Sequence, residues 1–425
     1  MLFFAELHID LFKTLATEKY GDYMATTIVI GAGQAGAEVA SRLRDEGYEG
    51  RIILVGQEKY MPYQRPPLSK KYMAGEIALE RLFLRPKEFY HKENIELHIG
   101  KTALKIDPKE QKVEFNNSYL NYDNLVLATG SKPREFPPYA GSEIKNLFTM
   151  RNLDDANSIE PYMRSGMHLL IVGGGYIGLE AAATAQKFGV DVTLVEIDDR
   201  ILKRVAAYET SDYIRSLHIS KGVKIKESTG LDKLEIVDNK VQSATLTDGS
   251  NIKVDFVIVG IGILPNTELA ESANLEINNG IFVNDKCQTS IANIYAAGDC
   301  TSFMHKSNLV RLESVGNAID QAAIVAQNIM QKNQSYIPKP WFWSDQYELK
   351  LQIAGLNTGY DEVIIRKSEN EQISHWYFKG HELLAVDALN DPRSYMIGKR
   401  LIEASKSPPK NQLQDKSFNL KALLK

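Results

Sequence analysis

The sequence predicts an α/β protein in which two glycine-turn βαβ units are followed by a smaller C-terminal α+β domain with an antiparallel sheet. Two glycine-rich turns carry this prediction, GAGQAG at residues 31–36 and GGGYIG at residues 173–178. Each follows a short apolar run and leads into small residues typical of a helix. Beyond about residue 336 the pattern alternates, as in an antiparallel sheet. One such turn is weak evidence, but two in matching context predict two Rossmann-like dinucleotide-binding domains.

Size and composition narrow the class of protein. The chain has 425 residues, enough for two or three domains with their own cores. A net charge of −4 gives no indication of nucleic-acid binding, and no apolar stretch approaches the roughly 20 residues that span a bilayer. Cys287 and Cys300 are the only cysteines. They exclude a disulfide framework and a CxxC pair, suit a reducing cytoplasm, and leave us expecting no metal site.

The first 24 residues require a separate interpretation. Residues 1–23 have helical apolar spacing, but Glu6 and Asp10 interrupt it and no basic start precedes it. A secretory signal is therefore not expected. Two interpretations stay open: an extra terminal helix, or translation that starts at Met24.

The first unit begins at Ala25. The apolar run at 27–30 predicts a strand, residues 34–46 a helix with one apolar side, and residues 51–55 the next strand. Together they form one βαβ unit with a right-handed crossover.

Each glycine of the first turn has its own expected role. Gly31 makes the tight turn, Gly33 lets the backbone approach a pyrophosphate, and Gly36 lets helix and strand pack closely. The helix N-terminus adds oriented N–H groups for the phosphates. Glu58 follows the second strand, where a carboxylate accepts hydrogen bonds from a ribose.

The second unit repeats this order with strands at 169–172 and 192–195 and a helix at 179–188. Its turn glycines are Gly173, Gly175 and Gly178. Glu196 ends the second strand. A carboxylate there pairs with a free 2′-hydroxyl and repels a 2′-phosphate, which favours NADH over NADPH. Arg200 and Arg204 lie nearby in sequence and could soften that preference.

The remaining segments are assigned more coarsely. Two strands are expected between the first unit and the NLVLATGSKPR run, and the tail after Pro408 is expected to be loosely held. The other predicted elements are strands in residues 255–266 and 293–300, each leading to a glycine turn, and a helix at 312–327.

Several motifs taken together resemble a known family. They are YMPYQRPPLSK (60–70), GGGYIGLE, GIGILPN, AAGDC, RLESVGNAIDQA (311–322) and WFWSDQY (341–347). The chain is similar over residues 25–400 to the two-dinucleotide (FAD/NADH) flavoproteins, and within them to the oxygenase-coupled ferredoxin reductases of the putidaredoxin, rubredoxin and biphenyl-dioxygenase reductase type. Gln64 and Gly316 depart from the residues common in that family and leave the subfamily open.

The resemblance implies an interleaved domain order. A discontinuous FAD-binding domain holds an inserted NADH-binding domain, and a C-terminal interface domain follows. The implied ranges are 1–24 for the extension, 25–140 and 270–335 for FAD, 141–269 for NADH, 336–408 for the interface domain and 409–425 for the tail.

The resemblance also implies residue roles. Lys70 and Glu180 pair beside flavin N5 as the catalytic residues. The residues implied for FAD are Gly31, Gly33, Gly36, Glu58, Arg65, Lys70, Ala128, Thr129, Gly130, Arg134, Asp299, Ser314, Val315 and Trp343. Those implied for NADH are Gly173, Gly175, Tyr176, Ile177, Gly178, Glu180, Glu196 and Gly262.

The implied reaction moves a hydride from NADH to FAD and then single electrons to a small iron–sulfur protein, a ferredoxin or rubredoxin serving an oxygenase or cytochrome monooxygenase. An acidic partner would meet a basic surface, for which Arg311, Lys339, Arg393, Lys399 and Arg400 are the candidates. No cysteine stands in RPPLSKKYMAG, where the disulfide reductases of the superfamily carry theirs.

Two alternatives remain. An NADH-sensing flavoprotein like apoptosis-inducing factor, acting through dimerisation, shares the Lys–Glu pair, although RLESV and FWSDQY match the reductases better. A component of a larger complex such as nitrite reductase would need iron–sulfur cysteines, which the chain lacks. A monomer and a homodimer are both compatible with the sequence.

Overall fold

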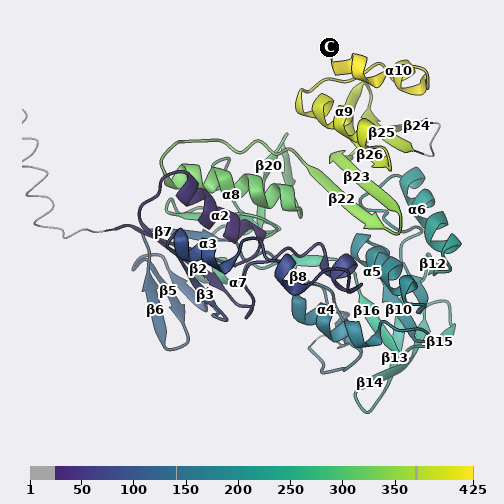
Figure 1. Ribbon diagram of the computed structural model, residues 1–425, viewed down its shortest axis with the longest axis horizontal. Helices are drawn as coiled ribbons and strands as arrows, with labels where there is room; N and C mark the ends of the chain where they lie inside the picture. Colours follow the sequence, from purple (N-terminus) through teal and green to yellow (C-terminus); the bar gives the residue numbers. More distant parts are fainter. Residues whose placement is uncertain (1–23, 140, 369–371, 425) are drawn as a thin grey trace, which may run out of the picture.

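The computed structural model describes residues 24–139, 141–368 and 372–424 (Figure 1). The expectations for residues 1–23 lie outside this part of the chain. The two predicted units form separate parallel sheets, and the C-terminal strands form a third sheet that lies beside the second unit in Figure 1. Within the described residues, no helix is long and apolar enough to cross a membrane.

The first sheet has the strand order β19-β7-β1-β2-β3 and is parallel throughout. Its core strands are almost wholly buried, which explains their continuous apolar sequences. Because β19 comes from residues far along the chain, this sheet is built from two stretches separated by the second unit. The strands are β1 (Thr26–Ile30), β2 (Arg51–Gly56), β3 (Ile95–Ile99), β7 (Asn124–Leu127) and β19 (Ile294–Ala296).

Helices α2 (Gln34–Asp45) and α8 (Val315–Ile329) pack against each other beside the first sheet (Figure 1). An antiparallel three-stranded sheet precedes β7, formed by β4 (Lys105–Asp107), β5 (Lys112–Phe115) and β6 (Ser118–Asn121). Four strands, β3 to β6, thus stand where the sequence predicted two.

The second sheet has the order β12-β11-β10-β16-β9, again parallel. Its strands are β9 (Leu147–Phe148), β10 (His168–Val172), β11 (Asp191–Val195), β12 (Lys224–Lys226) and β16 (Phe256–Val259). The accompanying helices are α4 (Leu153–Ile159), α5 (Tyr176–Lys187) and α6 (Tyr208–Ser220), and an antiparallel sheet comprises β13 (Leu231–Val237), β14 (Lys240–Leu246) and β15 (Asn251–Lys253).

The two units are joined by a short antiparallel ribbon of β8 (Ser131–Pro133) and β17 (Ile263–Pro265). The remaining short elements are α3 (Lys87–Lys92), α7 (Glu268–Ser272), a small sheet of β18 (Ile281–Phe282), β20 (Thr301–His305) and β21 (Asn308–Val310), the π-helical turn η1 (Leu68–Tyr72), and the 3-10 turns η2 (Leu79–Arg81), η3 (Pro137–Tyr139) and η4 (Glu160–Tyr162).

The C-terminal sheet is antiparallel, as predicted, with order β22-β23-β26-β25-β24. Leu349 and Leu351 of β23 share one apolar core with the second unit, which ties this sheet to it. Its elements are β22 (Trp341–Gln346), β23 (Leu349–Gly355), β24 (Glu362–Lys367), β25 (Ile373–Lys379), β26 (Glu382–Leu389) and helix α9 (Pro392–Glu403).

Three sequence expectations were wrong in detail. The second turn helix starts one turn earlier than predicted, at Tyr176, because Gly175 already serves as its N-cap. The helix expected at 312–327 starts at Val315, since Ser314 caps it. The tail is packed rather than loose. It forms α10 (Lys410–Gln414) and the 3-10 turn η5 (Leu420–Leu424), and it buries Leu413 and Leu420.

One side chain holds much of the tail. The Arg366 guanidinium donates hydrogen bonds to the backbone carbonyls of four tail residues, at 2.6 to 3.0 Å: Leu413, Asp415, Lys416 and Phe418. The sequence pattern around 409–425 is polar, so this contact with β24 could not be expected from it.

A buried polar cluster joins α6 to the C-terminal sheet. Asp387 accepts hydrogen bonds from Thr210 at 2.8 Å and from Tyr377, and His375 lies 2.7 Å from the Thr210 hydroxyl. Burial raises the pKa of Asp387 to about 6 and lowers the pKa of His375 to about 4.

These two groups have opposite effects on stability as pH falls. A carboxyl whose pKa is raised on folding adds stability at low pH and loses it as pH rises from about 4 to about 6. An imidazole whose pKa is lowered on folding loses stability as pH falls from about 6.5 to about 4. The two contributions largely cancel in the parent protein.

Asp387→Asn is therefore expected to expose the His375 contribution. Asparagine keeps an acceptor oxygen for Tyr377 and Thr210 but does not titrate. Relative to the parent, the free energy of unfolding of the variant should fall by about 2 kcal/mol between pH 7 and pH 4.5. Urea unfolding at both pH values measures this difference. An unchanged difference would show that Asp387 does not titrate in this range.

Candidate active site

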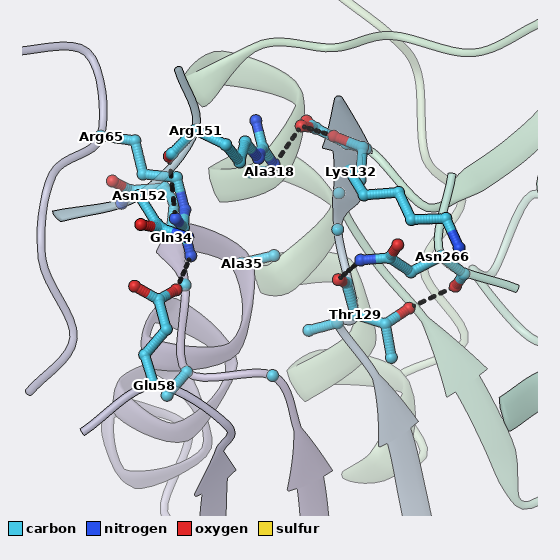
Figure 2. A pocket seen from close by; sticks show the side chains of 18 of the residues that line it. Gln34, Ala35, Glu58, Arg65, Thr129, Lys132, Arg151, Asn152, Asn266 and Ala318 are labelled. Atoms are coloured by element: carbon cyan, nitrogen blue, oxygen red, sulfur yellow. Dashed lines mark hydrogen bonds and ion pairs between the residues drawn. The ribbon is translucent and has the colours of Figure 1, made fainter. Parts of the chain in front are cut away.

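A cavity of about 1070 Å³ opens at the carboxyl ends of the first sheet, where ligands of open α/β sheets bind. It extends from the first glycine turn to the start of α5 in the second unit. In Figure 2, Glu58, Arg65 and Arg151 lie on one side of it and Thr129 and Asn266 on the other. This volume lies just above the range of roughly 300–1,000 Å³ for small-molecule pockets, which suits a large dinucleotide.

The first glycine turn is shaped by two different requirements. A Cβ on Gly31 would lie 2.0 Å from the Ala128 carbonyl oxygen, and one on Gly36 would lie 1.8 Å from the Gly31 oxygen. A Cβ on Gly33 would meet nothing within 4 Å. Contacts within the protein therefore require glycine at positions 31 and 36. At position 33, glycine would be required only by a bound molecule.

The N-terminus of α2 is suited to an anion. Gly33 caps it without a side-chain hydrogen bond, and its first turn contains no acidic residue. The N–H groups there keep the partial positive charge of a helix start, which phosphate groups use.

An ionic cluster lines the cavity beside β2. The Glu58 carboxylate accepts hydrogen bonds from the Arg65 guanidinium and the Tyr63 hydroxyl, both at 2.5 Å. Arg65 also donates to the Arg151 carbonyl at 3.1 Å, and the Tyr63 hydroxyl accepts from the Leu153 N–H at 3.1 Å. Burial raises the pKa of Tyr63, so this phenol stays protonated and keeps donating.

Asp299 of the AAGDC turn lies at the next part of the wall. Its Oδ2 accepts hydrogen bonds from Ser131 at 3.0 Å and from Arg151 at 3.1 Å. Among the described residues, no hydrogen bond is directed at Oδ1, which leaves this oxygen available to a ligand in the cavity. Gly298 before it has φ +88°, and a Cβ there would lie 3.0 Å from Ala35.

The cavity wall between the two units is tied together by a reciprocal pair. The Thr129 hydroxyl donates to the Asn266 carbonyl at 2.7 Å, and the Asn266 side chain donates to the Thr129 carbonyl at 2.8 Å (Figure 2). Ser314 and Val315 also line the cavity, and Ser314 caps α8 through the Asn317 N–H.

Lys70 and Glu180 meet at the inner end of the cavity. The Lys70 Nζ lies 2.8 Å from Glu180 Oε2, although 110 residues separate them in sequence. Both side chains are largely buried, at 14% and 5% exposure. Glu180 also accepts hydrogen bonds from Ser69 at 2.7 Å and Ser344 at 2.6 Å. The Glu180 carboxylate thus has three partners, and the ammonium group of Lys70 lies buried beside the cavity.

Aromatic side chains close this end. Tyr176 packs against Phe342 with ring centroids 4.9 Å apart, and its hydroxyl has no hydrogen-bond partner among the described residues. Burial raises its pKa, so the hydroxyl stays neutral. Trp343 also lines the cavity and stacks on Trp341 at 5.4 Å. A Cβ on Gly316 would lie 2.3 Å from the Trp341 indole nitrogen, so the glycine makes room for that ring.

The second glycine turn repeats the first. A Cβ on Gly173 would lie 2.5 Å from the Gly260 oxygen, one on Gly178 would lie 2.5 Å from the Gly173 oxygen, and one on Gly175 would meet nothing within 4 Å. Gly175 caps α5 without a side-chain hydrogen bond, and the first turn of α5 contains no acidic residue. This geometry would suit a second phosphate-bearing ligand.

Glu196 lies next to this second turn. Its carboxylate accepts hydrogen bonds from the Gly174 N–H at 2.7 Å and the Asp198 N–H at 2.9 Å. Arg200 is engaged inside its own loop, with hydrogen bonds to Ser211 and to the Lys203 and Ala206 carbonyls. It is therefore not available to a 2′-phosphate in this arrangement.

Most of the residues expected from the sequence surround this one cavity. Those among its lining residues are Gly31, Gly33, Glu58, Arg65, Lys70, Ala128, Thr129, Gly130, Tyr176, Ile177, Glu180, Asp299, Ser314, Val315 and Trp343. The turn residues Gly173, Gly175 and Gly178, together with Glu196, gather instead at the end of β10 and β11.

Two expectations need correction. Arg134 does not line the cavity. It is exposed, and its side chain lies within 4 Å of the Cβ position of Gly262, because β8 and β17 pair there. Arg311, expected on a basic surface, is 13% exposed and pairs with Glu313. Arg151 was missed because it lies outside the quoted motifs, and Tyr63 and Asn266, which lie inside YMPYQRPPLSK and GIGILPN, were given no role.

Cysteine chemistry is not available at this site. Cys287 and Cys300 are both buried and free, and no cysteine is among the described residues that line the cavity. Burial also raises the pKa of both thiols, which keeps them protonated and unreactive.

Two dinucleotide turns, one large cavity between them and a buried Lys–Glu pair where they meet define an oxidoreductase that brings two nucleotides together. Residues 25–322 match the family described as pyridine nucleotide-disulphide oxidoreductase, and residues 341–424 match the one described as reductase C-terminal. The chain belongs to the pyridine nucleotide-disulphide oxidoreductase family.

The chain is similar to several known reductases along nearly its whole length. Rhodocoxin reductase of Rhodococcus erythropolis is 40% identical over 398 residues, which cover 93% of each chain. Putidaredoxin reductase CamA of Pseudomonas putida is 40% identical over 405 residues, covering 93% of this chain and 96% of that one. The structure of a covalent putidaredoxin reductase–putidaredoxin complex superposes with a TM-score of 0.91 at 39% identity, covering 94% and 98%.

Proposed function

We propose that this protein is an FAD-containing reductase that takes electrons from NADH and delivers them to a small iron–sulfur protein of the ferredoxin or rubredoxin type, serving an oxygenase or cytochrome monooxygenase. The Lys70–Glu180 pair carries the proposal, because it links the first nucleotide site to the second. Similarity to rhodocoxin, putidaredoxin and rubredoxin reductases supports the choice of acceptor. A cytoplasmic location is proposed from the two free cysteines.

FAD fits the large cavity. Gly33 and the uncapped start of α2 would hold the pyrophosphate. Glu58 would accept from the adenosine ribose and Asp299, through Oδ1, from the ribityl chain. Arg151, paired with Asp299, holds that carboxylate in place. Arg134 lies beside Gly262, which was expected at the NADH site, so we assign it to the second nucleotide site rather than to this cavity.

The chemistry that FAD supplies is acceptance of a hydride and release of single electrons. The residues around FAD orient the reacting groups and shield them from water. Lys70 places a buried positive charge at the inner end of the cavity, and Glu180 fixes that charge. Tyr176 and Phe342 exclude water from the same place. Hydride transfer needs donor and acceptor atoms within roughly 3–3.5 Å, so this rigid enclosure serves orientation first.

Electrons would leave past Trp343, at the same aromatic end of the cavity. Trp343 lines the cavity and stacks on Trp341 beside α8. Exposed Lys339, Arg393 and Arg400 remain as the basic residues that an acidic iron–sulfur protein would meet. Arg311 is removed from that set because it is largely buried and paired with Glu313, and Lys399 because it is partly buried and paired with Glu403.

The test uses the purified holoprotein. We expect a yellow protein that NADH bleaches under anaerobic conditions. Rapid reduction of cytochrome c should require added ferredoxin or rubredoxin from the same organism. Failure of every iron–sulfur protein to accelerate it would reject the acceptor. Slow reoxidation with dimerisation on NADH addition would instead favour a redox-sensing role like that of apoptosis-inducing factor.

Coenzyme preference provides a separate prediction. Glu196→Gln keeps an acceptor for the Gly174 N–H but removes the charge that repels a 2′-phosphate. The ratio of kcat/KM for NADH over NADPH should fall by about tenfold or more. Steady-state kinetics with both coenzymes measure it, and Asp198→Asn, which changes a neighbouring half-exposed carboxylate, is the control. An unchanged ratio in Glu196→Gln would contradict the role of Glu196.

A further inference from the structure

A line of hydrogen-bonded side chains leads from the Lys70–Glu180 pair into the protein. Glu180 Oε1 accepts from the Ser344 hydroxyl at 2.6 Å. The Ser344 oxygen accepts from Gln346 Nε2 at 3.0 Å. Gln346 Oε1 lies 2.8 Å from His218 Nε2, and the Tyr347 hydroxyl lies 3.4 Å from His218 Nδ1.

These side chains are isolated from solvent. Ser344 and His218 have no exposed surface, and Gln346 is 1% exposed. Ser344 and Gln346 are two residues apart on β22, so both point to one face of the C-terminal sheet. That face meets α5, which carries Glu180, and α6, which carries His218. Three elements distant in sequence thus contribute to one continuous buried line.

The chemistry of the groups fixes the direction of every hydrogen bond. A carboxylate only accepts, so Ser344 must donate its single hydrogen to Glu180. The Ser344 oxygen must then accept from the amide nitrogen of Gln346, which turns the amide oxygen toward His218. His218 Nε2 must therefore carry a hydrogen, and Nδ1 accepts from Tyr347. Burial lowers the pKa of His218, which favours the neutral imidazole.

All donors in the line consequently point toward Glu180. Aligned hydrogen bonds polarise one another in a low-dielectric interior, so the line stabilises negative charge at that carboxylate. It cannot act as a proton wire. An amide does not pass a proton without changing its own bonding, and Gln346 stands in the middle of the line. The line instead fixes the position of the Glu180 carboxylate and the direction of the hydrogen bonds that lead to it.

We propose that Ser344, Gln346 and His218 are positioning residues whose aligned hydrogen bonds hold the Glu180 carboxylate in place for Lys70. The proposal rests on the assignment of FAD and NADH to this site. Ser344 makes the direct contact. Without it, Glu180 would interact more strongly with Lys70, and less of the lysine's positive charge would act on the flavin.

The experiment compares three serine variants of the FAD-loaded protein. Ser344→Ala removes the donor, and Ser344→Thr restores a hydroxyl. Ser374→Ala removes a buried serine hydroxyl of the same sheet that accepts from Trp376 and does not lead to Glu180. The flavin midpoint potential is measured by dye equilibration, and the rate of anaerobic flavin reduction by NADH is measured by stopped flow. Histidine ¹⁵N NMR reports the His218 tautomer.

We expect Ser344→Ala to make the potential more negative and to slow reduction by about tenfold, as for loss of one hydrogen bond to a charged group. Ser344→Thr should recover most of both, and Ser374→Ala should match the parent. His218 should show the Nε2–H tautomer in the parent. A normal potential and rate in Ser344→Ala, or a change only in its melting temperature, would overturn the proposal. Bleaching of the parent by NADH tests the underlying function independently.

Discussion

Replacing Lys70 by methionine is expected to slow reduction of the bound flavin by NADH about 100-fold, the effect of removing one preorganised charge from an enclosed site. The lysine is 14% exposed and lies 2.8 Å from Glu180, so no solvent cation replaces it. Stopped-flow mixing of the holoprotein with NADH measures the rate. FAD content should stay near that of the parent, because the pyrophosphate and ribityl contacts are elsewhere in the cavity.

The matched control is Lys71→Met. Lys71 is the adjacent lysine, it is exposed, and its loss should leave the rate unchanged. Lys70→Met also leaves a buried carboxylate without its cation, which costs roughly 3–5 kcal/mol of stability. The double variant Lys70→Met/Glu180→Gln removes both charges and should recover stability without recovering the rate. Recovery of the rate as well would show that Lys70 acts only through folding.

The residues that sequence reasoning found are those whose role is set by local geometry. The Cβ position of Gly36 is occupied by the backbone of Gly31, five residues earlier. The Cβ position of Gly31 is occupied by the backbone of Ala128, at the end of the adjacent strand β7. That requirement recurs in every such turn, so the spacing alone predicts the strand, turn and helix that the structure contains. The same requirement applies to Gly173 and Gly178 of the second turn.

The residues that it missed are set by contacts between distant segments. Arg151 reaches Asp299 from a loop 148 residues away, and Ser344 reaches Glu180 across 164 residues. Neither sequence neighbourhood requires the residue type. The Lys70–Glu180 pair is equally distant and was expected only through the family resemblance. Arg134 was expected at the FAD site from the same resemblance, but it is not among the residues that line the cavity and lies next to Gly262.

The packed tail was missed for a related reason. Its few apolar residues are too sparse to predict burial, yet Arg366 of β24 binds four of its carbonyls and gives the segment a defined path.

Gly316 appeared as an unexplained departure from the family pattern. The structure explains it by the Trp341 ring that lies 2.3 Å from its Cβ position.

Gly33 and Gly175 allow ligand binding to be tested separately from folding. Gly33 has φ −85° and Gly175 has φ −81°, which any residue adopts, and neither Cβ position has a neighbour within 4 Å. Gly33→Val and Gly175→Val should therefore both fold. Only a bound pyrophosphate lying against the turn would collide with the new side chain.

The expected outcomes differ because the two ligands differ. Gly33→Val should be purified without its yellow colour, with FAD affinity lower by at least about 100-fold, since an interaction with closely approaching N–H groups is lost. Gly175→Val should stay yellow and keep its flavin, but its KM for NADH should rise by a similar factor. Absorbance and FAD titration measure the first, and steady-state kinetics measure the second. Gly31→Val is the contrasting control: at φ +111° and 2.0 Å from a backbone oxygen it should fail to fold. If Gly33→Val instead bound FAD as the parent does, the pyrophosphate would not lie at this turn, and the assignment of FAD to the first unit would have to be abandoned.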